Sequence, residues 1–207
     1  MFLLTALLAT SQPALAAPTT YKLDPSKGNL YVLVYKDPNT SLAGMSHDHA
    51  VRATGWSGSV TWDPDNPGAC AIDITVPVRK LAVDEDHMRK LAGIEGSLDA
   101  GQREDIKENM LDDDQLDAGA FPNITFKASS CTGTAPSVTV KGDFNLHGKS
   151  QAKSVPMKVT VDGSSLKAKG SFETSCTAHG FEPFSALIGQ LKNQDKMKVV
   201  IDVQGRP

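Results

Sequence analysis

Apolar and polar residues alternate with a period of two along much of this sequence, and this pattern limits what the chain can fold into. In residues 121–129, Ile124, Phe126 and Ala128 alternate with polar neighbours. The same pattern recurs in residues 137–147, 154–161, 164–174 and 196–203. Because successive side chains of a β-strand point to opposite faces, each segment predicts a strand with one apolar face and one polar face.

Three earlier segments predict less regular strands. Residues 49–62 place both tryptophans on one parity, and residues 71–78 alternate aliphatic with mostly polar side chains. Residues 28–36 are apolar on both parities, as expected of a strand that is covered on both sides. Asp162-Gly163, between two of the later segments, is typical of a tight hairpin. Together these segments predict an all-β fold of about eight strands.

Eight amphipathic strands form either a sandwich or a closed barrel. Closure removes the exposed sheet edges, and a barrel of this size is filled by side chains or holds one small ligand. The inward-facing side chains are almost all aliphatic or Phe, so a cavity among them would take an apolar guest. The residues predicted to line it are Trp56, Val60, Ile72, Ile74, Val76, Ile124, Phe126, Val138, Val140, Phe144, Met157, Val159, Leu166, Phe172, Val199 and Ile201.

One interval, residues 83–118, breaks the strand pattern and predicts a short helical insertion between two strands. We expect Asp84 to cap a short helix whose apolar face includes Met88. Asp99, with Gln102 three residues later, resembles a capping box at the start of a second helix. No second domain is expected.

The first 17 residues predict a signal peptide. They carry no charge, contain an apolar run, and end in small-x-small patterns that suit a signal peptidase, although the usual basic start is missing. A buried N-terminal helix is the alternative. No later stretch approaches 18 apolar residues, so no membrane-spanning helix is expected. We therefore predict a periplasmic or secreted protein whose domain covers residues 18–207.

The three cysteines are interpreted in that compartment, where a cysteine pair is expected to be bridged. Cys70 opens one predicted strand and Cys131 closes another, so antiparallel pairing of the two would bring them together. Cys70–Cys131 is thus the favoured disulfide. Cys176 is left over, and we interpret it as a small buried apolar residue in preference to a reactive or intermolecular thiol.

Composition and motifs exclude several classes of function. A formal net charge of −3 argues against a nucleic-acid binder, and 40% hydrophobic residues exclude wholesale disorder. The sequence has no Gly-x-Ser-x-Gly nucleophile motif, phosphate loop, Cys-x-x-Cys or His-Glu-x-x-His. We therefore expect no enzymatic activity and no cofactor.

Several motifs together resemble the YceI-like family over about residues 20–204. The most specific block lies at 121–148, and the weaker opening motif is Tyr21-x-x-Asp24. The motifs, in chain order, are Tyr21-x-x-Asp24, Gly44-x-x-His47-x-His49, Arg103-x-Asp105, Phe121-Pro122-x-Ile124-x-Phe126-x-Ala128-Ser129 and Val140-x-Gly142-x-Phe144-x-Leu146-His147-Gly148.

The resemblance implies an extended antiparallel eight-stranded barrel of lipocalin-like form, with a helix or two packed on it. It also implies a secreted or periplasmic protein that binds a polyisoprenoid or another long-chain lipid inside the barrel. The ligand class that we expect is therefore an apolar lipid of the isoprenoid type.

His47 and His49 are the sharpest polar feature, because residues i and i+2 of a strand share a face and two imidazoles there could share a metal. A zinc site needs three or four protein ligands, and no spacing singles out a third among the other histidines. We therefore predict no metal. A contact with a lipid head group at the cavity mouth is the alternative, for which His47, His49, Arg52 and Arg103 are the candidates.

Three functions follow from these observations. The favoured one is a non-enzymatic protein that sequesters a long-chain apolar lipid. The second is a metal-binding or metal-dependent protein that uses His47 and His49. The third is a filled structural barrel that acts as a stress or secretion partner, which inward-pointing Trp56 and Trp62 would support.

Overall fold

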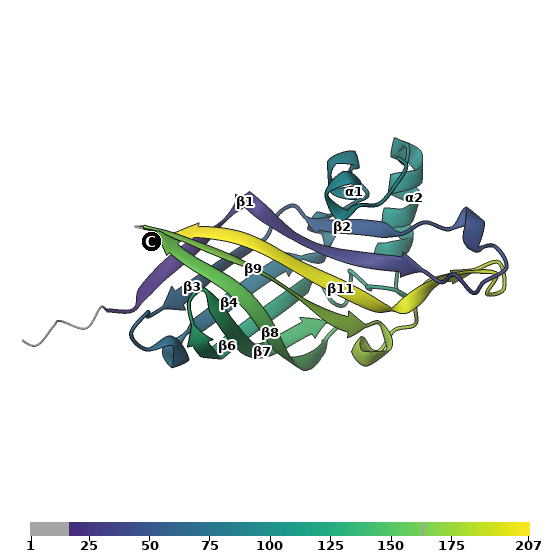
Figure 1. The fold of residues 1–207 in the computed structure, drawn as a ribbon. Coiled ribbons are helices and arrows are strands. Elements are labelled where there is room, and N and C mark those ends of the chain that lie inside the picture. The colour runs from purple at the N-terminus through teal and green to yellow at the C-terminus, as the bar shows by residue number, and fades with distance from the viewer. Residues whose placement is uncertain (1–16, 163) are drawn as a thin grey trace, which may run out of the picture.

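The computed structural model describes residues 17–162 and 164–207. The predicted signal peptide lies almost entirely outside the described residues. Eleven strands form one antiparallel sheet that closes on itself (Figure 1). They are β1 (Thr19–Lys36), β2 (His49–Ala53), β3 (Ser57–Trp62), β4 (Ala71–Pro77), β5 (Leu81–Val83), β6 (Asn123–Thr134), β7 (Ser137–Leu146), β8 (Lys149–Asp162), β9 (Ser165–Ser175), β10 (Ser185–Ala186) and β11 (Leu191–Arg206).

Eight of these strands make the closed ring, in the order β1-β11-β9-β8-β7-β6-β4-β3 and back to β1. Closure depends on the pairing of β1 with β11, in which Val32 lies opposite Val199. The structure thereby confirms the predicted all-β, eight-stranded antiparallel barrel. The hairpin predicted at Asp162-Gly163 is consistent with the pairing of Asp162 with Ser165, although Gly163 itself lies outside the described residues.

Two of the barrel strands bend and continue as shorter strands. The chain reaches β3 through the shorter strand β2, and it continues from β4 into the shorter strand β5. In the β3–β4 pair Val60 lies opposite Ile72, and in the β2–β5 pair Val51 lies opposite Val83. Both β2 and β3 pair with β1, but with different parts of it. The sequence predicted one strand over residues 49–62, whereas the structure interrupts it at residues 54–56.

The bend leaves β5 at the end of the sheet, with β2 as its only strand neighbour among the described residues. The helices α1 (Asp86–Ala92) and α2 (Ala100–Leu111) lie at this end of the barrel, where α1 packs on β2 and α2 packs on β5 (Figure 1). Asp99 and Gln102 form the predicted capping box at the start of α2. A helix therefore covers the place where strand pairing stops.

Short 3-10 helices form several of the connections. They are η1 (Ala43–Met45), η2 (Pro67–Ala69), η3 (Val78–Lys80) and η4 (Thr177–His179). η3 makes the bend between β4 and β5, and η1 lies in the long β1–β2 connection, beside the start of β11.

The interior divides into two regions along the barrel axis. The packed half is the region around β3, the start of β4 and the paired parts of β6 to β9, whose buried side chains include Trp62, Val138 and Leu166. The cavity half is the opposite end, where β2, β5, α2 and β10 lie and where Val34 and Leu146 face the interior.

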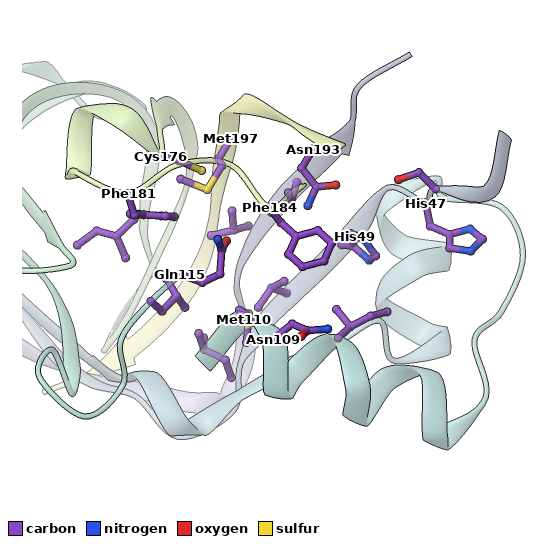
Figure 2. A pocket seen from close by; sticks show the side chains of 18 of the residues that line it. His47, His49, Asn109, Met110, Gln115, Cys176, Phe181, Phe184, Asn193 and Met197 are labelled. Carbon is purple, nitrogen blue, oxygen red and sulfur yellow. The ribbon is translucent and has the colours of Figure 1, made fainter. Parts of the chain in front are cut away.

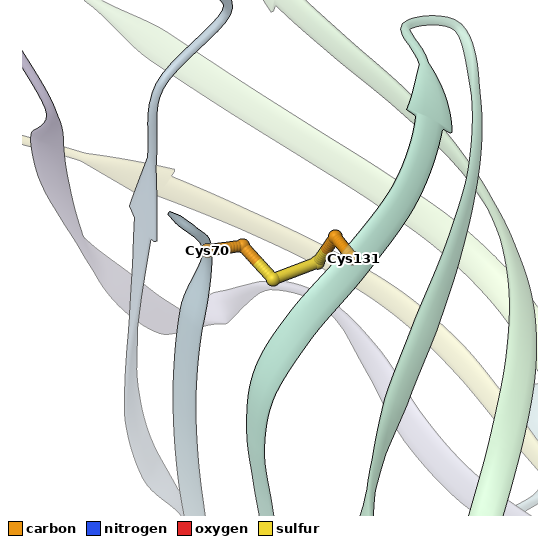
Figure 3. The surroundings of a disulfide bond; sticks show 2 residues. All are labelled: Cys70 and Cys131. Carbon is orange, nitrogen blue, oxygen red and sulfur yellow. A yellow bond between two sulfur atoms is a disulfide. The ribbon is translucent and has the colours of Figure 1, made fainter. Parts of the chain in front are cut away.

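A disulfide joins Cys70, just before β4, to Cys131 in β6, as predicted (Figure 3). Their Cα atoms are 5.8 Å apart, and both side chains are buried. The bridge lies between neighbouring strands of the packed half. Cys176 is the free cysteine and is buried, which agrees with its interpretation as a small apolar residue.

Candidate functional site

A cavity of about 300 Å³ lies in the cavity half of the barrel (Figure 2). Its wall combines strand side chains that point inward with residues of α2, of the segment after α2, and of the connection between β9 and β11. Fifteen of the lining residues are apolar or Cys: Val32, Val34, Met45, Val51, Leu81, Ile106, Met110, Leu116, Ile124, Leu146, Cys176, Phe181, Phe184, Leu191 and Met197. Ligand pockets of about 300–1,000 Å³ are typical of proteins, so this cavity lies at the small end of that range.

Six polar residues complete the lining: Ser46, His47, His49, Asn109, Gln115 and Asn193. The Gln115 amide donates to the carbonyl oxygens of Asp114 and Glu182. The wall is thus mainly apolar, with a few polar groups from separate elements. An apolar molecule with one polar end matches such a surface.

His49 is held from behind by a buried carboxylate. Its Nδ1 lies 2.6 Å from Oδ2 of Asp84, which is fully buried just after β5. The other carboxylate oxygen accepts hydrogen bonds from the Ala50 amide at 2.9 Å and from Arg89 Nη1 at 3.1 Å. Asp84 was expected to cap α1, but Glu85 occupies the N-cap position and Asp84 points inward.

The carboxylate of Asp84 is stabilised in its charged form. Burial by itself would raise the pKa of Asp84, but the hydrogen bonds from His49 and Ala50 and the positive charge of Arg89 outweigh burial and lower it. Arg89 is also buried, and its guanidinium donates to the carbonyl oxygens of Asp48, Glu95 and Gly96. The Asp84–Arg89 pair therefore fixes both α1 and the imidazole of His49.

His47 lines the same cavity from the segment before β2. Partial burial, followed by the electrostatic interactions with His49 and Arg89, lowers the pKa of His47. Among the described residues, the set of three or more possible metal ligands within 4.8 Å of one another is Asp112, Asp113 and Asp114, all exposed. Neither His47 nor His49 belongs to it.

The two arginines proposed for a head group lie outside the cavity lining. Arg52 follows Val51 in β2, and strand alternation turns it to the outer face, where its Nε and Nη2 donate to Glu85 at 2.7 and 2.8 Å. Arg103 donates to the carbonyl oxygen of Leu98 and lies 3.8 Å from Asp86. Both cations thus have partners on the insertion itself.

Most of the sixteen residues predicted to line the cavity lie in the packed core instead. Ile124 lines the cavity, and the other fifteen lie in the core or pack against it. They face inward, as the alternation requires, but neighbouring side chains fill the space between them. Phe144 and Phe172, for example, meet edge to face with ring centroids 5.2 Å apart. Both tryptophans are buried in the core.

Much of the cavity wall comes from residues that the strand pattern does not select. Ile106 and Met110 come from α2, where their i, i+4 spacing places both side chains on one helix face. Phe181 and Phe184 lie in a connection with no alternation. The helical spacing was a usable signal for the first pair, whereas only the folded chain brings the second pair to the cavity.

Of the other three histidines, His87 is exposed on α1, whereas His179 and His147 have structural surroundings. His179 is fully buried; its Nδ1 donates to the Lys149 carbonyl oxygen, and its Nε2 accepts from Thr174 Oγ1. Burial lowers the pKa of His179. His147 packs against the rings of Phe121 and Phe181.

No helix among residues 17–162 and 164–207 has the length and the apolar character needed to cross a bilayer. Known structures with a similar fold include BcnA of Burkholderia cenocepacia, which is 16% identical at a TM-score of 0.65. That likeness covers 88% of this chain and 98% of BcnA.

A second similar structure is a mutant Campylobacter jejuni YceI protein crystallised with a monobromobimane guest. It is 13% identical at a TM-score of 0.56, over 76% of this chain and 84% of that one. None of the curated proteins compared matches the chain. The family model described as the YceI-like domain matches residues 21–205, which is most of the described barrel. The sequence match and the closed barrel together show that this protein belongs to the YceI-like family.

Proposed function

We propose that this protein is a periplasmic or secreted carrier that sequesters a long-chain apolar lipid of the isoprenoid class in the cavity half of its barrel. The observation that supports this proposal is the cavity, which is lined by fifteen apolar or Cys side chains and six polar ones. It acts by binding and catalyses no reaction. The disulfide between Cys70 and Cys131 is compatible with an oxidising compartment.

The size of the cavity limits how much of a chain is enclosed. A volume of about 300 Å³ holds a short chain or one end of a longer one. Each buried methylene contributes about 0.8 kcal/mol, or about fourfold in Kd. Affinity should therefore rise with chain length until the cavity is full and then level off, because the packed half leaves no further room.

Native mass spectrometry and lipid extraction of protein purified from its own host test this function. We expect a bound long-chain lipid that organic solvent releases. A series of isoprenoid alcohols of increasing length should then show rising affinity that reaches a plateau. Host protein without bound lipid, combined with no measurable affinity for any member of the series, would contradict the proposal.

A further inference from the structure

One polar group in the cavity wall differs from the others in how it is held. His49 is largely buried, with 13% of its side chain exposed, and it contacts both the cavity and the fully buried carboxylate of Asp84. Asn109 and Asn193 also line the cavity, and Figure 2 shows the Phe184 ring between them in that view, with His49 beside it. His47, which interacts electrostatically with His49, and the apolar ring of Phe184 also line this cavity.

The hydrogen bond to Asp84 determines which ring nitrogen carries the proton. A carboxylate can only accept, so Nδ1 of His49 is the donor in the 2.6 Å contact. In the neutral ring, Nε2 then carries a lone pair and is an acceptor. No hydrogen bond to Nε2 occurs among the described residues, and the side chain lines the cavity. The wall thus presents one oriented acceptor.

The charges behind His49 restrict what this acceptor can bind. The charge of Asp84 is already balanced by Arg89, 3.1 Å away, so a cationic head group would add a positive charge beside an existing one. An ester or a hydrocarbon offers no proton to Nε2. A hydroxyl can donate a hydrogen bond, and a carboxylic acid can either donate one or transfer its proton and remain paired with the imidazolium.

We propose that His49, oriented by Asp84, receives the polar end of the bound lipid, and that this end is a proton-donating hydroxyl or carboxylic acid group. The inference rests on the proposed function, since it specifies the head group of the lipid that the cavity takes. Asn109 and Asn193 also line the cavity, and their amides are further hydrogen-bond donors available to a bound molecule. The lipid chain then extends toward Met110 and Met197.

Three ligands that share one chain test this proposal by calorimetry on the full chain: hexadecanoic acid, hexadecan-1-ol and methyl hexadecanoate. We expect the acid and the alcohol to bind at least about fivefold more tightly than the ester, which lacks a proton to donate. This comparison needs no variant. Equal affinities for all three would overturn the inference and leave the proposed carrier function intact, whereas no binding by any of them would overturn both.

The variant His49→Phe keeps an apolar ring and removes the acceptor. We expect it to bind the three ligands with affinities within about twofold of one another, because only burial of the chain remains. The matched control is His87→Phe on the exposed face of α1, which should retain the preference for the acid and the alcohol. A folded His49→Phe protein that retains the preference would overturn the inference.

Discussion

The packed half and the cavity half of the barrel are closed by different interactions. In the packed half, β3 and β4 continue the hydrogen-bonded ring, the interior is filled by side chains such as Trp62 and Leu166, and a disulfide crosses between strands. In the cavity half, α2 covers the end of the sheet beside β5, and the buried Asp84–Arg89 pair fixes the insertion.

The difference shows how one barrel combines stability with a binding site. Continuous strand pairing brings inward side chains into close contact, which leaves no room for a guest. Beside β5 the sheet is covered by α2 and not by a further paired strand, and there Ile106 and Met110 line a cavity. Predictions that treat the two halves separately can therefore test this division.

The largest expected effect is loss of the disulfide in the packed half. For a sequence separation of 61 residues, the chain-entropy model gives about 4 kcal/mol. We expect Cys70→Ser/Cys131→Ser to lower the free energy of unfolding by about that amount in urea titrations. Lipid affinity of the fraction that remains folded should be unchanged, because the cavity lies at the other end. A decrease of less than about 1 kcal/mol in the free energy of unfolding would argue against a major contribution of the disulfide to the stability of the packed half.

The next effect concerns Asp84 in the cavity half. Replacing one partner of a buried ion pair typically costs about 3–5 kcal/mol, and Asp84→Asn should approach the lower end because Arg89 keeps three carbonyl acceptors. The lost charge pairing should appear as faster amide exchange in α1 and β2. Exchange in β7 and β8 provides the internal control, since the packed half does not depend on this pair.

Asp84 also sets a pH dependence. Its pKa in the folded protein is lowered below the ordinary 3.8, so its contribution to stability is complete above that value and is lost as pH falls through the lower folded pKa. We expect hydrogen exchange to show the cavity half opening first when pH falls below about 4. His179 also destabilises the folded protein as pH falls below about 6.5, before Asp84 is protonated. Burial lowers the pKa of His179 from 6.5, so the unfolded chain binds this proton more readily than the folded one. Uniform opening of both halves in acid would contradict the division.

A matched pair of leucines should show a smaller difference. Leu166 is fully buried in the packed half, and Leu146 is buried but lines the cavity. Leucine-to-alanine changes in cores cost about 2–5 kcal/mol, increasing with the void that they create. We expect Leu166→Ala to cost about 1–2 kcal/mol more than Leu146→Ala, because Leu146 already has free space on one side. Only Leu146→Ala should shift the lipid-length plateau, toward longer chains.

The smallest effect on stability is expected at Cys176. Burial, followed by the negative charge of Asp195, raises the pKa of its thiol to about 12, so alkylation at pH 7 should be very slow. Cys176→Ala should change stability little, because one side of the residue faces the cavity. The rate of alkylation at pH 10, followed by mass spectrometry, should fall when lipid fills the cavity. An unchanged rate under saturating lipid would place the ligand elsewhere.

The alternation of residues predicted most of the barrel strands, and together with the expected oxidising compartment it predicted the disulfide. Each strand is determined locally, by which side of a pleated backbone carries the apolar side chains, and Cys70 and Cys131 lie at strand positions that antiparallel pairing brings together. The bend between β2 and β3 shifts this alternation, because His49 and Val51 face the cavity before it, whereas Val60 and Trp62 are buried after it. The capping box of α2 is equally local.

The cavity depended on information that no single segment contains. Alternation indicates that Phe144 and Ile124 face inward, but whether the facing side chains meet or leave a void depends on the distance between opposite walls. The sequence determined the strands, the disulfide and an apolar interior. Only the tertiary structure decided that α2 covers the sheet beside β5. It also decided that Asp84, which is 35 residues from His49 in the sequence, contacts the His49 ring. The physical reason is that packing distances and buried charge pairs arise between segments that are far apart in the chain.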